Sequence, residues 1–235
     1  MHPVPPVIVE SVILPLSLPK GKNSRISLAL PLLLALLCIP QARAQDSALI
    51  RRVDDHYNHL RTLRARYTER YTGMGMDRSE SGTLTLKKPG LMRWSYDAPP
   101  GKLFVLDGKF AWFYTPGDAQ VSRAPAKQLD DLRSPLRLLL GHTQLSKELD
   151  QIATAPDGAN FRITGVPKGM DRRVHLLTLI VTSTGAIARL KLEETDGATT
   201  EFTFTSLEED IPLPASDFIF TPPPGIPIVS AQPPI

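Results

Sequence analysis

The chain has 235 residues, a formal net charge of +3 and one cysteine. Its first 44 residues hold four basic residues and one acidic residue, so 23 basic and 23 acidic residues remain after them, and this balance indicates that nucleic acid is not a partner. The cysteine, Cys38, lies in the same first segment, so the rest of the chain has neither a thiol nucleophile nor a disulfide and depends on its core for stability. Leu37 precedes Cys38 where a lipidation signal has a small residue, which argues against a lipid anchor.

Residues 1–44 have the pattern of a secretory signal peptide. Lys20, Lys22 and Arg25 precede an apolar run from Ile26 to Pro40 that is too short to span a membrane, and the A-x-A sequence of residues 42–44 follows as a cleavage site. A buried N-terminal helix is the alternative interpretation of the apolar run. We expect export to the periplasm of a Gram-negative-type envelope, and the 191 residues that remain of 235 after 44 are removed can fold as one domain.

A helix is the first element predicted in the exported part. It begins at the capping residue Asp46, and apolar residues then recur at spacings of 4, 4, 3 and 3, which places them on one helical face: Leu49, Val53, Tyr57, Leu60 and Leu63. Strand patterns follow over residues 66–72, 83–86, 91–97, 102–106 and 110–115. Asp107-Gly108 between the last two strands is typical of a hairpin turn.

The hydrophobic period changes after residue 125. Leucines recur every 3 to 4 residues and Ser134-Pro135 reads as a cap with a first-turn proline, so two short helices are predicted at 126–132 and 135–141. Strands return at 161–165, 174–182, 187–195, 199–207 and 218–220, and a proline-rich tail begins at Pro222. This order predicts an α+β, mostly β chain of antiparallel meanders joined by tight turns.

Candidate catalytic and metal-binding residues are few. Asp55, His56 and His59 form a D-H-x-x-H cluster, but the third ligand is adjacent only in sequence, so a solvated helix face is the better interpretation. Surface positions are also the interpretation for the isolated histidines and the adjacent acids: His142, His175, residues 193–194 and residues 208–210. Because no nucleophile or phosphate-binding motif is present, we expect no enzymatic activity, no metal and no cofactor.

A lysine shares a strand face with two leucines. Leu84, Leu86 and Lys88 have the same parity, so their side chains point the same way in a strand. Lys88 then either extends its ammonium group to water or donates hydrogen bonds to carbonyl groups of a covering helix. Apolar residues also occupy both faces of the strand at 102–106, so part of the sheet is covered on both sides or one face lines a cavity.

Several segments resemble the LolA-like family of periplasmic outer-membrane lipoprotein carriers: KKPGLMRW at 87–94, Pro99, DGK at 107–109, WFYTP at 112–116 and FIFTPPPG at 218–225. The resemblance covers most of residues 46–229. It implies an incomplete, strongly curved antiparallel β-barrel closed by a helical lid, in a single domain over residues 45–229 followed by a short flexible tail at 230–235. The partners it implies are acylated lipoproteins, an inner-membrane ABC transporter that releases lipoproteins and, as a further expectation, an outer-membrane lipoprotein receptor, with the carrier itself a monomer.

The resemblance also implies site residues. An acyl-chain cavity is expected between Leu84, Leu86, Met92, Trp94, Phe104, Leu106, Trp112 and Tyr114, and a lid at Leu129, Leu132, Leu136 and Leu139. The family has an arginine before the proline of the first motif that latches the lid, and this position is Lys88 here, which donates as a compact point charge rather than a planar fork. A carrier of free lipid or glycolipid, a sensor of envelope lipoproteins and an enzyme acting on envelope lipids stay as alternatives, although the last lacks a nucleophile–base pair.

Overall fold

The computed structural model describes residues 39–127, 139 and 144–230, and the side chains of its first helix from Ser47 onward. The first element is helix α2 (Ile39–His59), and a short helix α5 (Leu145–Glu148) and a 3-10 helix η1 (Ala215–Phe218) follow later in the chain. The strands are β1 (Thr62–Gly73), β2 (Met76–Lys87), β3 (Leu91–Tyr96), β4 (Leu103–Asp107), β5 (Phe110–Tyr114), β6 (Val121–Pro125), β7 (Leu149–Asp157), β8 (Asn160–Pro167), β9 (Val174–Val181), β10 (Ile187–Glu194), β11 (Thr199–Glu209) and β12 (Ile228–Ser230).

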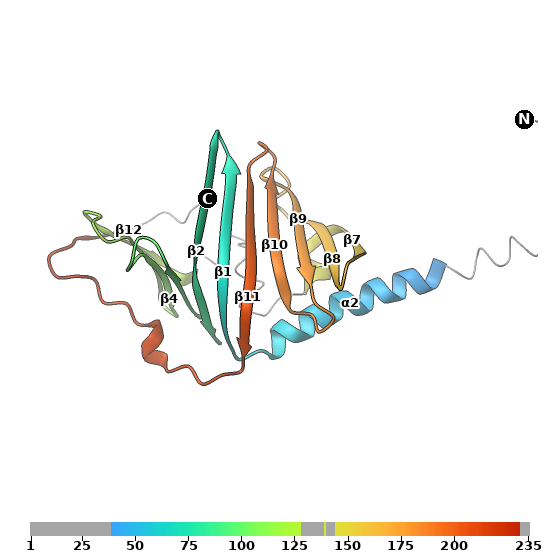
Figure 1. Cartoon of the computed structure of the whole chain (residues 1–235), viewed down its shortest axis with the longest axis horizontal. Helices are drawn as coiled ribbons and strands as arrows, with labels where there is room; N and C mark the ends of the chain where they lie inside the picture. Colours follow the sequence, from blue (N-terminus) through green and yellow to red (C-terminus); the bar gives the residue numbers. More distant parts are fainter. Residues whose placement is uncertain (1–38, 128–138, 140–143, 231–235) are drawn as a thin grey trace, which may run out of the picture. The chain divides into compact units, whose positions relative to one another are not determined.

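These strands form one curved sheet in the order β12-β6-β5-β4-β3-β2-β1-β11-β10-β9-β8-β7 (Figure 1). Neighbouring strands are antiparallel except for β12, which pairs with β6 in parallel. Two meanders, β1 to β6 and β7 to β11, meet where β1 pairs with β11. In the described part of the chain β12 and β7 are the two ends of the sheet, which confirms the predicted mostly β fold with a curved, unclosed sheet.

Helix α2 ends earlier than its apolar spacing predicts. The helix stops at His59, where the Leu60 amide still donates to the His56 carbonyl at 3.1 Å, and Leu63 already lies in β1. Leu60 and Leu63 are nevertheless buried with the apolar face of α2, so the spacing identifies their burial but not their secondary structure. Among the described helices, none is long and apolar enough to cross a membrane.

The strand predicted at residues 218–220 is wrong. Helix η1 ends at Phe218, which is buried, and Ile219 and Phe220 form no regular element; Ile219 is 64% exposed, and three consecutive prolines that cannot donate to a sheet follow at 222–224. The last strand is instead β12, and β6 and β7 were not predicted from the sequence. The predicted helices at 126–132 and 135–141 fall mostly outside the described residues; those described there, 126, 127 and 139, are helical.

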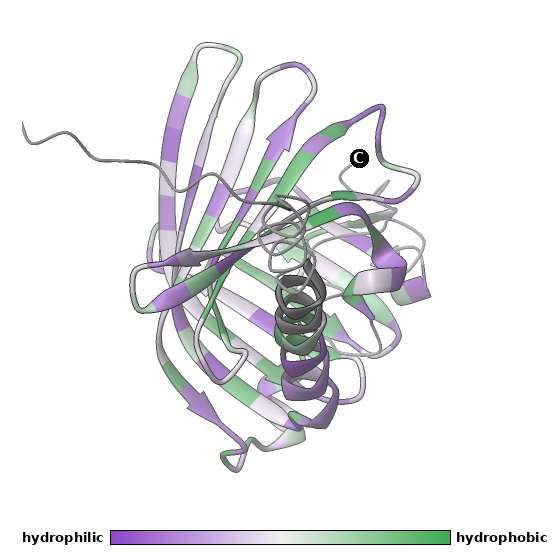
Figure 2. Ribbon diagram, turned by 90° about the vertical axis from the view of Figure 1, so that its right-hand side faces the viewer, coloured by the Kyte–Doolittle hydropathy of each residue, from purple (hydrophilic) through white to green (hydrophobic). Residues whose placement is uncertain are grey.

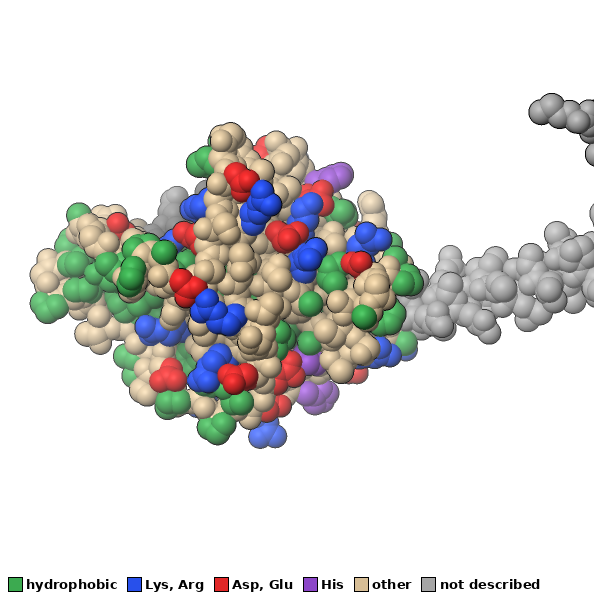
Figure 3. All heavy atoms as spheres, in the orientation of Figure 1, with side chains coloured by type: hydrophobic (Ala, Val, Ile, Leu, Met, Phe, Trp, Pro, Cys, Tyr) green, Lys and Arg blue, Asp and Glu red, His purple; other side chains and the backbone are tan. Residues whose placement is uncertain are grey.

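The two faces of the sheet have different coverings. The inner face curves around α2 and carries the main apolar cluster (Figure 2). On the outer face of β4 to β6, a second apolar cluster of Leu103, Val105, Trp112 and Val121 is covered by Phe220 and Ile226 of the C-terminal segment. Figure 3 shows basic and acidic side chains scattered instead over the face of β1, β2 and β11, and some of them form ion pairs, such as Arg70 with Asp77.

Candidate functional site

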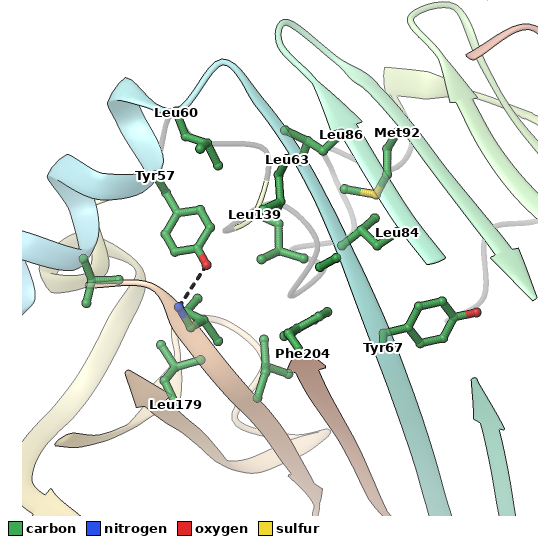
Figure 4. Close-up of a cluster of buried hydrophobic side chains, with 14 of the residues drawn as sticks. Tyr57, Leu60, Leu63, Tyr67, Leu84, Leu86, Met92, Leu139, Leu179 and Phe204 are labelled. Atoms are coloured by element: carbon green, nitrogen blue, oxygen red, sulfur yellow. Dashed lines mark hydrogen bonds between the residues drawn. The ribbon is translucent and has the colours of Figure 1, made fainter. Parts of the chain in front are cut away.

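Six predicted cavity residues form one layer of the inner face. Antiparallel pairing sets Leu86 opposite Met92 and Leu84 opposite Trp94, and the next strand adds Leu106 and Phe104 in the same two rows. Because residues of equal parity share a face, these side chains make a continuous apolar surface. Each of the six is at most 6% exposed. Figure 4 shows Leu84 and Leu86 pointing toward the helix side of the sheet, with Met92 beside them.

The rest of the apolar cluster comes from elements far apart in the sequence. Strand β1 adds Leu63 and Tyr67, β11 adds Phe204, and β9 and β10 add further buried residues such as Leu179 (Figure 4). The ring of Trp94 makes edge contacts with Tyr67 and Phe202, at centroid distances of 4.5 and 5.5 Å. The surface is therefore apolar and aromatic across the join between the two meanders.

Trp112 and Tyr114 do not belong to this surface, and their assignment to the cavity is corrected. Trp112 is paired with Val105 and packs in the outer cluster, where Tyr114 also lies. The residues of β5 that share the inner face are Ala111, which is paired with Leu106, and Phe113, which is paired with Phe104 at a ring-centroid distance of 4.8 Å. The alternation of side chains in β5 was the signal that identifies Phe113.

Of the four predicted lid residues, the structure describes one. Leu139 is 2% exposed and lies within the inner cluster, and Figure 4 shows it beside Leu63. Leu129, Leu132 and Leu136 lie outside the described residues.

Helix α2 packs against the inner apolar cluster. Its face of Leu49, Val53 and Tyr57 is buried in the inner cluster, together with Leu60 just beyond the helix. Tyr57 is anchored at its tip, where its hydroxyl oxygen accepts a hydrogen bond from the Ile187 amide at 3.0 Å (Figure 4). Burial of this ring raises the pKa of Tyr57, so the hydroxyl stays neutral.

Lys88 meets the last turn of α2. Its ammonium group donates to the backbone carbonyl of Tyr57, so of the two alternatives left by the sequence the structure has the contact with a helix carbonyl. Carbonyl groups in the last turn of a helix have no partner within the helix and carry the negative end of its dipole, so a cation is favourable there. Burial lowers the pKa of Lys88, and the nearby Asp210 carboxylate opposes this shift.

Further polar contacts join α2 to the β9–β10 turn, to β11 and to α5. Arg52 donates to the Ser183 carbonyl at 2.9 Å, and the His56 ring lies 3.0 Å from a Glu209 oxygen. On another side the Asp54 carboxylate accepts from the Leu145 amide at 2.9 Å, and burial raises the pKa of Asp54. The partners are 91 to 153 residues away in sequence, so no local pattern could have indicated them.

The β9–β10 turn approaches α2 most closely at Gly185. A Cβ atom there would lie 2.7 Å from the Arg52 carbonyl oxygen, and the residue has φ +94°. Only glycine fits both conditions. The sequence had indicated a turn at this point but not its contact with the helix.

The remaining candidate residues that the structure describes make separate contacts. His56 contacts Glu209, whereas His59 contacts the Asp55 carbonyl oxygen at 2.8 Å in its own helix. In residues 39–127, 139 and 144–230 no group of three metal-ligating side chains is close enough to hold an ion. His175 is exposed in β9, and His142 lies outside the described residues.

Comparisons with known proteins agree with this geometry. The family model "Outer membrane lipoprotein carrier protein LolA" matches residues 58–221. The outer-membrane lipoprotein carrier protein of Pseudomonas paraeruginosa is 31% identical over 192 residues, covering 80% of this chain and 90% of the relative, and that of Chromobacterium violaceum is 28% identical, covering 81% and 91%. An uncharacterized conserved protein from Thermus thermophilus shares the fold with a TM-score of 0.50 at 14% identity, over 79% of this chain and 98% of that one. The chain belongs to the LolA family of outer membrane lipoprotein carrier proteins.

Proposed function

We propose that this protein is a periplasmic chaperone that shields the acyl chains of lipoproteins and carries them from the inner to the outer membrane. The observation that carries the proposal is the inner apolar cluster, whose surface runs over β1 to β4 and β11 beneath α2. Each CH₂ group of an acyl chain that is removed from water contributes about 0.8 kcal/mol. Packing against this apolar surface would therefore be more favourable for an acyl chain than exposure to water.

Uptake requires the covering elements to move. The six strand residues that line the surface are at most 6% exposed, because α2 and Leu139 pack against the same cluster. An acyl chain would replace these contacts with its own, so the closed and loaded arrangements bury similar apolar groups. Two arrangements of comparable free energy are what a ligand needs to shift a population without an external energy source.

Lys88 is the residue that we propose as the latch of the closed arrangement. Its bond to the Tyr57 carbonyl joins the end of β2 to the end of α2. A lysine donates from a point charge and rotates freely, whereas an arginine holds a planar fork in place. The lysine latch would therefore open with a smaller loss of interaction, which suits cargo that must be released again.

The same proposal includes the route and the partners. An inner-membrane ABC transporter would supply the lipoprotein, and an outer-membrane receptor would accept it. Residues 1–44 would direct export as a signal peptide, and the carrier would act as a monomer. Carriage of this kind uses non-covalent binding to the apolar surface, so the proposed role includes no catalytic step.

Photo-cross-linking tests the cargo site. p-Benzoylphenylalanine in place of Phe104 puts the reactive group on the inner surface, and the same replacement of Phe110 puts it on the outer cluster as a matched control. We expect mass spectrometry of the protein isolated from the periplasm to show acylated protein attached at position 104 and not at 110. Attachment of free lipid alone at 104 would assign the surface to lipid transport, and equal labelling at both positions would refute the inner site.

A further inference from the structure

The tip of the β1–β2 hairpin is an exposed apolar point. Met74 is 83% and Met76 57% exposed, and they are two of only four large hydrophobic residues that are exposed in the described part of the chain. Met74 and Gly75 have φ of +51° and +76°, and Gly73 pairs with Met76, so a two-residue turn closes the hairpin. Both methionines therefore stand at the very end of two 12-residue strands (Figure 1).

This tip is remote from the candidate cargo site. At about 3.3 Å per residue, it lies roughly 25 Å along β2 from Leu84 of the inner cluster and roughly 35 Å from Lys87, where the hairpin begins beside α2. Strand β3 pairs with β2 only as far as Gly82, so beyond that point the hairpin extends past its neighbour on one side. On the other side β11 accompanies it to Thr72.

Behind the methionines lie two arginines, a tyrosine and one acid, and the pair of Glu69 with Glu80 follows one position further down the hairpin. The Arg70 guanidinium forms two hydrogen bonds with the Asp77 carboxylate, at 2.7 and 3.0 Å, so this acid is neutralised. Arg78 lies over the ring of Tyr71, 6.0 Å from its centroid. The segment from Arg70 to Arg78 thus carries one net positive charge behind an apolar point.

The neighbouring β10–β11 turn adds one carboxylate, Asp196. It accepts a hydrogen bond from the Ala198 amide of its own turn at 2.9 Å, so part of its charge is compensated locally. Apolar side chains at the end, with tyrosine and arginine just behind them, are the order that a lipid interface favours, where methionine meets acyl chains and arginine meets phosphate.

We propose that the Met74–Met76 tip inserts into the surface of a phospholipid membrane, with Arg78 at the level of the lipid phosphates. A protein partner fits less well, because a specific interface takes about 800 Å² from each partner and two side chains on a narrow turn supply far less. A lipid surface needs no shaped counterpart. The proposal does not depend on what the inner cluster binds.

Vesicle flotation with the exported chain, residues 45–235, tests this directly. The double variant Met74→Gln/Met76→Gln is compared with the native chain on vesicles of phosphatidylethanolamine and phosphatidylglycerol, and Ile219→Gln is the matched control for an exposed apolar residue elsewhere. Residues 1–44 are left out of all three proteins, because the apolar run of the proposed signal peptide would itself bind vesicles and mask the contribution of the tip. All three side chains are exposed, so the variants should fold, which circular dichroism verifies.

We expect the double variant to partition onto vesicles at least tenfold more weakly, because burying one methionine is worth a factor of roughly ten to one hundred. Ile219→Gln should partition as the native chain does, and Arg78→Gln should lose the part of binding that salt suppresses. Equal flotation of the double variant and the native chain would overturn the proposal.

Discussion

Replacing Lys88 with methionine tests whether this residue holds α2 on the inner cluster. Methionine keeps most of the apolar stem but removes the donor to the Tyr57 carbonyl. A hydrogen bond from a charged donor contributes about 1.5–3 kcal/mol, and because Lys88 is only partly buried we take the lower end. A loss of about 1.5 kcal/mol raises the open population about tenfold.

Hydrogen exchange of the α2 amides measures this opening, because exchange reports the population in which the helix has left the sheet. Lys87→Met is a closely matched control: Lys87 is also partly buried and donates to a backbone carbonyl, that of Leu213 at 2.6 Å, but in the C-terminal segment. We expect Lys88→Met to speed exchange in α2 about tenfold, and Lys87→Met to affect residues near Leu213 instead. Unchanged α2 exchange in Lys88→Met, or an equal acceleration in both variants, would refute the latch.

Three further predictions concern the same contacts. Gly185→Ala should lower the free energy of unfolding by about 1–3 kcal/mol more than Gly158→Ala, since both have positive φ but only Gly185 would press a Cβ against the α2 backbone; chemical denaturation of the two variants measures the difference, and equal losses would contradict the contact. Gly82→Ala should destabilise the sheet by a similar amount, because its Cβ would lie 2.1 Å from the Ser95 carbonyl oxygen, and a thermal midpoint equal to that of the native chain would count against this packing. Burial lowers the pKa of Lys88 in the closed arrangement, so between this lowered pKa and the ordinary value the open arrangement binds more protons. Raising the pH through that window should therefore lower the open population, and with it the hydrogen exchange of the α2 amides after correction for the intrinsic rate. This trend should vanish in Lys88→Met.

The strand half of the site could be predicted because a period of two is a local signal. Leu84 and Leu86 are two residues apart, as are Met92 and Trp94, so each pair is assigned to one face before any strand pairing is known. The hairpin signal at Asp107-Gly108 then fixes the register of the next pair, and the Asp107 carboxylate accepts from the Phe110 amide at 2.7 Å. Local parity and turn chemistry together were enough to identify this layer.

The covering half could not be predicted to the same depth. The contacts of Arg52 with Ser183 and of His56 with Glu209 join residues 131 and 153 positions apart, and neither leaves a trace in the local pattern. Strand β7 was missed because its burial is irregular and its pairing shifts between Asp150 and Ala153, which removes the period of two. Trp112 lies on the outer face because it pairs with Val105 and has the opposite parity to the inward-facing Phe113.

The inner cluster is at once the main core of the described chain and the proposed cargo surface, and this has a consequence for how the protein is held together. A core that must open cannot rely on apolar packing alone, since the cargo supplies equivalent packing and would compete without preference. In the proposed carrier, polar contacts would distinguish the closed arrangement: the hydrogen bonds that join Arg52 and Tyr57 of α2 to Ser183, Ile187 and Lys88, which an acyl chain cannot replace. In the proposed carrier, the apolar contacts would therefore set how much acyl chain can be held, and the polar contacts of α2 would set how readily the chain is released.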